Sequence, residues 1–468
     1  MRQLTRRLKP ALVGDRAFYR TVLAITMPML IQNSVANFII LLNNIMVGQL
    51  GTAQMSGVAV AGQLMVIVNL CIFGGLSGPS IYGAQFYGAG NLKGLLHTFR
   101  LRLWVVGLVF VAALAVLSIW GADLIGLFLQ GEGTQAEARD VMDYALRYMR
   151  IIIWGVLPSG LTQSYAGVLR ETGETTLPMK AGIAAVLTNL LGNWLLIFGN
   201  LGCPALGVTG AAVSTLISQC LELGIIAFGA HTTPRHVFLR GAYRTLRVPL
   251  KLARTVTTRG LPLLVNELIW SLGATMMMQL YSMRGLQVLA GLNIAGTVSN
   301  MFNTSFIALG NTVAVIIGQI LGAGEVDKAR RSAWQLTALT AAVCVVMGGI
   351  MALLAGFFPT LYNTEDAVRT MASRFILTSA LLMPLHASAH ISFHTLRAGG
   401  STTVTFIFDS GYSWLIMIPF TMALVHLTDL PILVLYPLSQ ATAIIKSLMG
   451  ILFVARSKWA KNIVQVDA

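Results

Sequence analysis

Long apolar runs separated by short polar segments make up most of this chain. A helix needs about 20 mainly apolar residues to cross the hydrocarbon core of a bilayer, and twelve runs reach that length. We expect membrane-spanning helices at residues 20–47, 56–83, 101–121, 143–168, 179–199, 207–230, 260–283, 287–320, 334–357, 371–395, 403–425 and 431–454. The pattern predicts an all-α integral membrane protein with twelve transmembrane helices.

Two sequence motifs recur in the second half of the chain. The segment Gln85–Gly90 (Gln-Phe-Tyr-Gly-Ala-Gly) returns 234 residues later as Gln319–Gly324 (Gln-Ile-Leu-Gly-Ala-Gly). The segment Leu169–Gly173 (Leu-Arg-Glu-Thr-Gly) corresponds to Leu396–Gly400 (Leu-Arg-Ala-Gly-Gly). We therefore expect two pseudo-symmetric six-helix lobes, an arrangement typical of secondary transporters.

The spans and repeats divide the chain into five parts. We expect an N-terminal arm at 1–19, a first lobe at 20–230, a linker at 231–259, a second lobe at 260–454 and a tail at 455–468. If the N-terminus is cytoplasmic, 25 of the 32 Lys and Arg residues fall on the cytoplasmic side. Loops rich in Lys and Arg stay in the cytoplasm. This predicts a multi-pass inner (plasma) membrane protein with arm, linker and tail all cytoplasmic.

Composition supports the membrane assignment and excludes other classes. Hydrophobic residues make up 56% of the chain and charged residues 10%, whereas a soluble domain carries roughly 25% charged residues. The net charge of +15 lies in short loops between apolar runs, as orientation in a membrane requires. We therefore expect no nucleic-acid partner. The sequence also lacks a phosphate-binding loop or a nucleophile motif, so we do not expect an enzyme.

The linker at 231–259 is strongly basic and holds seven Lys or Arg residues. Basic and apolar positions alternate in it as on an amphipathic surface helix. The apolar positions are Leu239, Tyr243, Leu246, Leu250 and Ala253. This pattern predicts an interfacial segment that lies on anionic lipid. A helix that binds a partner protein is the alternative.

Several motifs together resemble the multidrug and toxic compound extrusion (MATE) transporters. Besides the two repeated motifs, they are Asn44–Gly51 (Asn-Ile-Met-Val-Gly-Gln-Leu-Gly), Asn193–Gly199, Gly207–Ala212 and the Pro262, Glu267, Trp270 pattern. The resemblance covers essentially the whole chain. It implies two six-helix lobes that face a central cleft and cation-coupled export of organic, often cationic, compounds.

The chain departs from that family at two positions of the first lobe. Many family members have aspartate where this chain has Asn43 and Asn193. These residues, with Asn189, can offer carbonyl oxygens as a polar site, but they cannot titrate. Coupling to a cation is therefore expected to depend on other residues.

Two carboxylates in the second lobe are the leading candidates for cation coupling. Glu267 lies in the span at 260–283 among apolar neighbours, and Asp409 lies in the span at 403–425. Charges inside a membrane are costly and usually functional, and apolar surroundings favour a neutral carboxyl. Glu267 is thus suited to carry a proton. The alternative for each residue is a structural hydrogen bond to a neighbouring helix.

Histidines form a row in the span at 371–395. His386, His390 and His394 follow one another at intervals of four residues, which keeps them near one helix face. Histidine titrates near physiological pH, so His386 and His390 are candidates for a proton relay. Metal binding at this spacing has no third-ligand motif to support it, and we expect no metal site. Hydrogen-bonded packing is the third interpretation.

Aromatic and thioether side chains near these carboxylates suit a flat cationic ligand. The candidate substrate-binding residues are Asn266, Trp270, Met277, Tyr412 and Trp414. Residues of these types also pack helices or face lipid.

The predicted function is export of an organic, cationic small molecule by proton- or sodium-coupled antiport with alternating access. The alternative within the same superfamily is a flippase for lipid-linked oligosaccharides, which needs several basic residues in its cleft; the spans contain almost none beyond Lys446. A membrane-embedded enzyme is disfavoured by the missing motifs. We expect no cofactor besides the coupling H⁺ or Na⁺, membrane lipid as surroundings, and a monomer.

Overall fold

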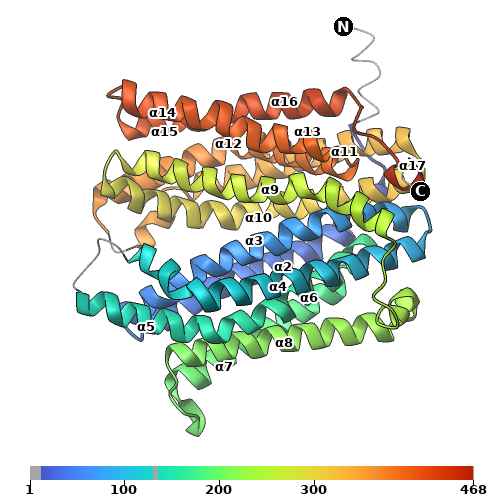
Figure 1. The fold of residues 1–468 in the computed structure, drawn as a ribbon. Helices are drawn as coiled ribbons and strands as arrows, with labels where there is room; N and C mark the ends of the chain where they lie inside the picture. Colours follow the sequence, from blue (N-terminus) through green and yellow to red (C-terminus); the bar gives the residue numbers. More distant parts are fainter. Residues whose placement is uncertain (1–11, 130–134, 363, 467–468) are drawn as a thin grey trace. The chain divides into compact units, whose positions relative to one another are not determined.

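The computed structural model describes residues 12–129, 135–362 and 364–466, and every regular element in these ranges is a helix (Figure 1). The expected all-α class is therefore confirmed. Most of the predicted N-terminal arm, residues 1–11, lies outside the described residues.

The helices of the first half are α2 (Arg16–Gly48), α3 (Thr52–Gly88), α4 (Leu92–Phe128), α5 (Gln135–Ile152), η2 (Ile153–Gly155), α6 (Val156–Glu171), α7 (Thr176–Phe198), η3 (Asn200–Gly202), α8 (Val208–Thr232) and η4 (Pro234–Gly241). The second half contains α9 (Leu250–Ser282), α10 (Leu286–Gly322), α11 (Val326–Leu353), η5 (Phe358–Leu361), α12 (Asp366–Ala398), α13 (Thr402–Phe406), η6 (Ile407–Gly411), η7 (Ser413–Met417), α14 (Ile418–Leu427), α15 (Ile432–Gln440), α16 (Ala443–Ala455) and α17 (Ile463–Val466).

Eleven helical segments of the described chain are long and apolar enough to cross a membrane. The remaining predicted span, at 143–168, is not a single helix. It is built from α5 and α6 with the single turn η2 between them. Pro158 lies in the first turn of α6 and has no N–H to donate to the carbonyl four residues earlier. The missing bond explains why the helix tightens into a 3₁₀ turn at this point.

The chain forms two compact units. The N-terminal unit comprises Ile31–Gly83 and Leu92–Thr257. The C-terminal unit comprises Thr258–Ala468 together with Met1–Leu30 and Ala84–Asn91. The start of α2 and the end of α3 therefore pack with the second half of the chain.

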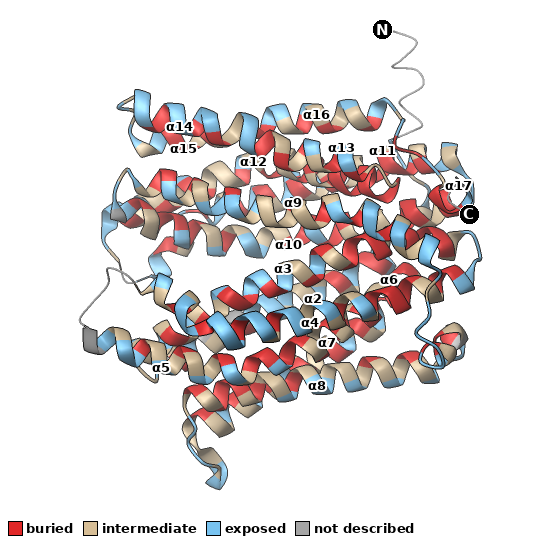
Figure 2. Ribbon diagram, viewed as in Figure 1, coloured by how far each residue is buried: buried red, intermediate tan, exposed pale blue. Residues whose placement is uncertain are grey.

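The core of the C-terminal unit is formed around α10 and α12. Val22, Ile25 and Met29 of α2 join a buried cluster with residues such as Ile317 and Leu396. Among the membrane-spanning segments, α10 and α12 have the largest buried shares, whereas α4 of the N-terminal unit has the smallest (Figure 2). Exposed apolar side chains along α4 suit contact with lipid tails.

The repeated Gln-x-x-Gly-Ala-Gly motif has a structural reason. In the C-terminal unit its two copies cross each other at very short range. A Cβ atom added to Gly88 would lie 2.0 Å from the carbonyl oxygen of Gln319, and one added to Gly322 would lie 2.0 Å from that of Gln85. The first glycine of each copy is therefore required by the close approach of two helix backbones.

The last glycine of each copy ends its helix. Gly90 and Gly324 have φ of 71° and 83°, the left-handed conformation that glycine adopts without strain. The N–H groups of the residues that follow return to carbonyls of the last turn, Asn91 to Phe86 and Glu325 to Ile320. This is the hydrogen-bonding pattern of a Schellman C-cap.

The chain end is fastened to this crossing. The Gln85 amide donates to the carbonyls of Ala398 (2.9 Å) and Lys461 (3.2 Å) and accepts from the N–H of Ile463 (2.9 Å). Asn462 donates to the carbonyl of Gly322 (3.1 Å), and Trp459 is 2% exposed. The tail residues are thus part of the packed C-terminal unit.

We predict that Gly322→Ala destabilises the protein, because its methyl group has no room at the motif crossing. Overpacking of this kind costs about 1–3 kcal/mol. The apparent melting temperature of the purified protein in detergent is expected to fall by several degrees. Gly296→Ala on the same helix is the matched control, since no atom lies within 4 Å of its added Cβ. Equal melting temperatures for the two variants would contradict the proposed crossing.

Candidate functional site

A largely buried ion pair lies at the centre of the polar residues of the C-terminal unit. Lys446 Nζ donates to Asp409 Oδ1 at 2.6 Å, and Asn266 Nδ2 donates to Asp409 Oδ2 at 2.9 Å. The side chains of Lys446 and Asp409 are 18% and 13% exposed. Both oxygens of the carboxylate therefore have a donor, and the two charges compensate each other.

The local backbone around Asp409 departs from a regular α-helix. The residues Ile407–Gly411 and Ser413–Met417 form two successive π-helical segments within the predicted span at 403–425. Wider turns of this kind rotate the side chains that follow and are frequent at functional sites. The Ser413 hydroxyl donates to the carbonyl of Asp409 at 2.9 Å.

Neighbouring side chains hold the ion pair in place. Asn266 accepts a hydrogen bond from the Ser410 hydroxyl (2.7 Å) through the oxygen of the amide that binds Asp409. The Lys446 ammonium lies 5.2 Å from the centre of the Tyr412 ring, within range of a cation–π contact. Tyr412 in turn donates to Thr442 Oγ1 at 2.7 Å. The network joins α9, the π-helical segments and α16.

Glu267 differs from Asp409 in having no ion pair or hydrogen bond within the described parts of the chain. It is half-buried on α9, next to Asn266. Its electrostatic neighbours are Arg397 and Asp409. Glu267 is thus a carboxyl near the ion pair that is available to bind a proton or another cation.

Two members of the histidine row, His390 and His394 of α12, pack closely against each other. The ring centres of His390 and His394 are 4.6 Å apart. The ring of Phe306 meets that of His390 edge-on, with 5.2 Å between the ring centres. Gly310 of α10 makes room for them, because an added Cβ would lie 2.7 Å from Cδ2 of both rings. His390 Nε2 and His394 Nδ1 are buried with no hydrogen-bond partner among the described residues.

The charges of the ion pair act on two of the histidines. His390 interacts with Asp409 and Lys446, and His386 interacts with Lys446. No group of three His, Cys, Asp or Glu residues that could hold a metal ion occurs within residues 12–129, 135–362 and 364–466. The histidines therefore lie within electrostatic range of the ion pair, and the described residues show no hydrogen bond between them and that pair.

The candidate substrate-binding residues fall into two groups. Asn266, Tyr412 and Met277 are 1%, 4% and 6% exposed, and Met277 belongs to a packed apolar cluster. Trp270 and Trp414 are 49% and 37% exposed, and Trp414 donates to the carbonyl of Ile269 at 3.1 Å. Only the two tryptophans offer much accessible aromatic surface.

The three asparagines of the N-terminal unit lie together. Asn193 Nδ2 donates to Asn43 Oδ1 at 2.6 Å and to Asn189 Oδ1 at 3.3 Å. Asn189 donates to Thr215 Oγ1 at 3.2 Å. The cluster is neutral and hydrogen-bonded, without a carboxylate at these positions.

The two halves use different positions of the repeat for their polar clusters. The shift of 234 residues maps Gln32 onto Asn266, and the shift of 227 residues maps Gly182 onto Asp409. Gln32 Nε2 lies 3.2 Å from the position of a Cβ added to Gly182. The N-terminal unit thus has the amide of this pair but not the carboxylate.

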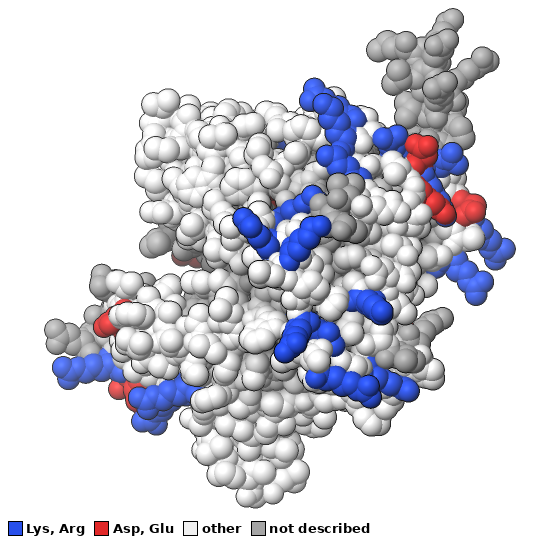
Figure 3. Space-filling model, turned by 45° about the vertical axis from the view of Figure 1, so that its right-hand side comes forward, with Lys and Arg blue, Asp and Glu red and all other residues white. Residues whose placement is uncertain are grey.

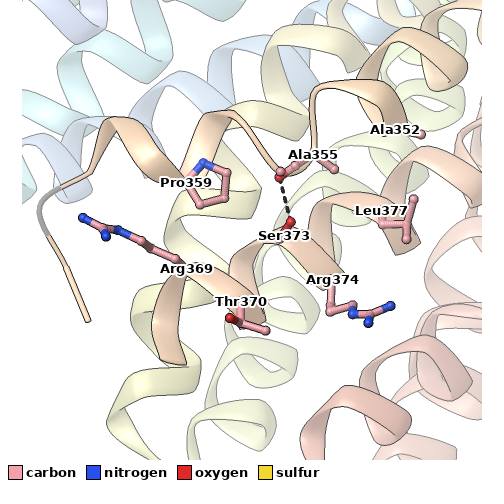
Figure 4. A pocket seen from close by; sticks show the side chains of 9 residues that line it. Ala352, Ala355, Pro359, Arg369, Thr370, Ser373, Arg374 and Leu377 are labelled. Atoms are coloured by element: carbon pink, nitrogen blue, oxygen red, sulfur yellow. Dashed lines mark hydrogen bonds between the residues drawn. The ribbon is translucent and has the colours of Figure 1, made fainter. Parts of the chain in front are cut away.

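A cavity of about 440 Å³ lies elsewhere in the C-terminal unit, between the end of α11, η5 and the first turns of α12 (Figure 4). Its lining includes Ser373, which donates to the carbonyl of Ala355, and the side chains of Arg369 and Arg374 extend in opposite directions. None of the candidate residues lines it. Two guanidinium groups also make it unsuitable for an organic cation.

Comparison with known proteins identifies the family. The MatE family model matches residues 28–195 and 262–423, more than half of the chain. This chain belongs to the MATE family. The MATE chain is a multi-pass membrane protein of a multidrug efflux transporter family, and it is not an enzyme.

Curated relatives of this MATE chain carry names of the same kind. It is 25% identical to the probable multidrug resistance protein YoeA of Bacillus subtilis, with 96% of each chain covered. It is 24% identical to the probable multidrug resistance protein NorM of Thermotoga maritima, with 89% of this chain and 88% of the relative covered. The flippase alternative is not favoured by these matches.

Solved MATE structures share the fold. An outward-facing MATE family transporter of the MOP superfamily superposes with a TM-score of 0.82 at 18% identity, with 96% of this chain and 98% of that chain covered. A mutant of the Vibrio cholerae MATE transporter VcmN gives a TM-score of 0.84 at 17% identity, with 95% and 98% covered. The two-lobe, twelve-helix MATE fold predicted from the sequence is consistent with both.

Sequence reasoning noted Lys446 in the MATE chain but did not pair it with Asp409. A signal was present, because a lysine inside an apolar span needs a compensating charge. The sequence analysis did not single out Arg102, which lies in α4, is 1% exposed and forms an ion pair with Glu171. Here the closest signal was the acidic residue in the Leu169–Gly173 motif.

We predict that Lys446→Met strongly destabilises the transporter, because it leaves Asp409 buried without its counter-charge. Removing one partner of a buried ion pair costs about 3–5 kcal/mol. The double variant Asp409→Asn/Lys446→Met should regain a large part of the loss, measured as thermal unfolding in detergent. Asp143→Asn, which breaks the exposed pair with Arg147, is the control and should cost less than about 1 kcal/mol. If the stability losses of Asp409→Asn and Lys446→Met simply added up in the double variant, the ion pair would not contribute to stability.

Proposed function

We propose that this MATE transporter exports organic, cationic compounds by proton-coupled antiport with alternating access. The observation that carries the proposal is the division of work between two neighbouring carboxylates. Asp409 is occupied by Lys446 and Asn266, while Glu267 has no such partner in the described chain. Glu267 is therefore the group proposed to exchange a proton for the substrate.

The lysine favours protons over sodium as the coupling ion. A sodium site built on Asp409 would place a second cation beside the Lys446 ammonium, which is 2.6 Å from the carboxylate. Repulsion between like charges is strong in surroundings from which water is excluded. Arg397 adds a further positive charge near Glu267. Protonation neutralises Glu267 without placing a free metal cation between these groups.

Exchange follows from competition at Glu267. A protonated carboxyl has no charge with which to hold an organic cation, and a bound cation opposes protonation. Each ligand therefore weakens the affinity for the other by the same factor. His390 and His386, which interact with the Asp409–Lys446 pair, are proposed to pass protons to this region.

Aromatic surface next to Glu267 supports a cationic substrate. Trp270 lies three residues further along α9 and is 49% exposed, and Trp414 is anchored to the carbonyl of Ile269 on that helix. The faces of these rings can attract a cation through their π-electrons. The names of the curated relatives as multidrug resistance proteins agree with a broad range of substrates.

We predict that Glu267→Gln abolishes gradient-driven export while the protein still folds, because glutamine keeps the shape of the side chain and removes only its charge. Purified protein in proteoliposomes would be tested with an organic cation under an imposed proton gradient and, separately, a sodium gradient. Wild type should respond to the proton gradient. Glu222→Gln, another carboxyl change in a spanning helix, should retain export. Export by Glu267→Gln at the wild-type rate would exclude Glu267 as the coupling group.

The proposed orientation places both termini and the linker in the cytoplasm, since most Lys and Arg residues lie on that side. We predict that single cysteines at Thr232, at the start of the linker, and at Asp429, between α14 and α15, label from opposite sides. The measurement uses a membrane-impermeant maleimide on intact cells and on inverted vesicles of a variant without its four natural cysteines. Labelling of both positions from one side would contradict the twelve-span topology.

A further inference from the structure

The linker between the two halves of the chain is held firmly against α4 in the N-terminal unit. The Arg100 guanidinium donates to three main-chain carbonyls of the linker: Gly241 (3.0 Å), Ala242 (3.1 Å) and Arg247 (3.4 Å). The indole N–H of Trp104, one turn further along α4, donates to the carbonyl of Leu246 at 3.0 Å. These bonds fix the backbone of the linker from Gly241 to Arg247.

A second set of contacts fixes the start of the same segment. The Tyr165 hydroxyl lies 2.8 Å from His231 Nε2 and 2.5 Å from the hydroxyl of Tyr243. Arg240 donates to the carbonyl of His231 at 3.1 Å. The linker therefore has a defined conformation on the helices, and the surface that it forms with α4 is built into the fold.

A cavity of about 430 Å³ opens between α4 and the linker. It is lined by Leu101, Trp104, Leu246, Arg247, Val248 and Ala253. Five of these six side chains present apolar surface, and the sixth is a guanidinium. Trp104 and Leu246 are 58% and 42% exposed, and the neighbouring Leu250 is 83% exposed. An open apolar cavity beside a positive charge matches a molecule with a hydrocarbon chain and an anionic head.

The charge of the linker is entirely positive. Residues 231–259 contain seven Lys or Arg and no Asp or Glu. The predicted amphipathic surface helix does not form here, because residues 242–249 connect η4 to α9 without regular helix. Arg244 and Arg247 lie on this connection and Lys251 lies in the first turn of α9, and all three are exposed. Figure 3 shows charged residues only in patches, in which Lys and Arg predominate, on a surface that is otherwise mostly uncharged. Each basic residue near an anionic lipid surface contributes about 1 kcal/mol to the free energy of binding to that surface.

We propose that the cavity between α4 and the linker is a binding site for an anionic phospholipid. The phosphate group binds Arg247, with Arg244 and Lys251 nearby, and the first part of an acyl chain lies against Trp104 and Leu246. A bound lipid stabilises the docked linker, because it contacts both α4 and the segment that Arg100 holds. The acidic phospholipids of the membrane thereby influence the connection between the two halves of the transporter.

Tryptophan fluorescence in lipid nanodiscs tests this proposal, because Trp104 lines the cavity. The full-length protein would be compared in nanodiscs that contain brominated phosphatidylglycerol or brominated phosphatidylcholine, each mixed with unlabelled phosphatidylcholine. The part of the quenching that disappears in Trp104→Phe reports on the site. We expect that part to favour phosphatidylglycerol at low salt and to lose the preference at high salt.

The variant Arg244→Gln/Arg247→Gln should weaken the preference by at least about fivefold, the factor expected from one basic residue at an anionic surface. Lys328→Gln/Arg331→Gln makes the same charge change at the start of α11 and should leave the preference unchanged. Ala253→Phe fills the cavity without changing charge and should also reduce the preference. Protein yield and melting temperature verify that each variant is folded.

Three results would overturn the proposal. Equal quenching of Trp104 by the two lipids would leave the linker as a surface for another partner, such as a protein helix. An unchanged preference in Arg244→Gln/Arg247→Gln would show that these arginines do not bind the head group. Loss of the preference in inorganic phosphate, but not in chloride of equal ionic strength, would indicate a site for free phosphate and not for lipid.

Discussion

A charge that enters the apolar interior of this protein must find a partner there, because water is not available to solvate it. Two ion pairs satisfy this constraint, the buried pair Arg102–Glu171 in the N-terminal unit and the largely buried pair Asp409–Lys446 in the C-terminal unit. Glu267 is the informative exception, with Arg397 and Asp409 as electrostatic neighbours and no hydrogen bond within the described residues. A carboxyl in this situation gains most from binding a proton or an external cation, which is what a coupling group must do.

The two halves of the chain share a repeat but have specialised differently. The N-terminal unit has the neutral cluster of Asn43, Asn189 and Asn193, which is held by hydrogen bonds between amides. The C-terminal unit has the charged network around Asp409, at a position where the repeat places Gly182 in the first half. Of these two polar clusters, the one that contains a carboxylate is thus in the C-terminal unit. The proposed proton coupling belongs to that unit for this reason.

The two halves of the chain share the backbone features of the repeat without sharing all of its polar residues. Gly88 and Gly322 recur because two helix backbones cross within about 2 Å of where a Cβ would lie, and Gly90 and Gly324 recur because each helix ends in a left-handed residue. These requirements concern the backbone and leave other positions of the repeat free to differ. The linker adds a third element, since Arg100 and Trp104 bind its main chain and leave the side chains of Arg244 and Arg247 exposed.

The sequence by itself determined the features that depend on local composition. Apolar runs of sufficient length specified the spanning helices, the repeated glycine motifs revealed two related halves, and Glu267 and Asp409 were identified because charges are rare in such runs. The three asparagines of the first lobe were also expected to act together, and they do lie together.

Only the tertiary structure decided which of these residues meet. The pairing of Asp409 with Lys446, the approach of Gly310 to His390 and the burial of Arg102 depend on how helices far apart in the sequence pack. The π-helical turns at 407–417, which set the direction of Asp409, have no strong local signal either. Hydropathy measures how apolar a segment is, whereas partner choice depends on rotation, depth and distance between helices, which only the packed chain determines.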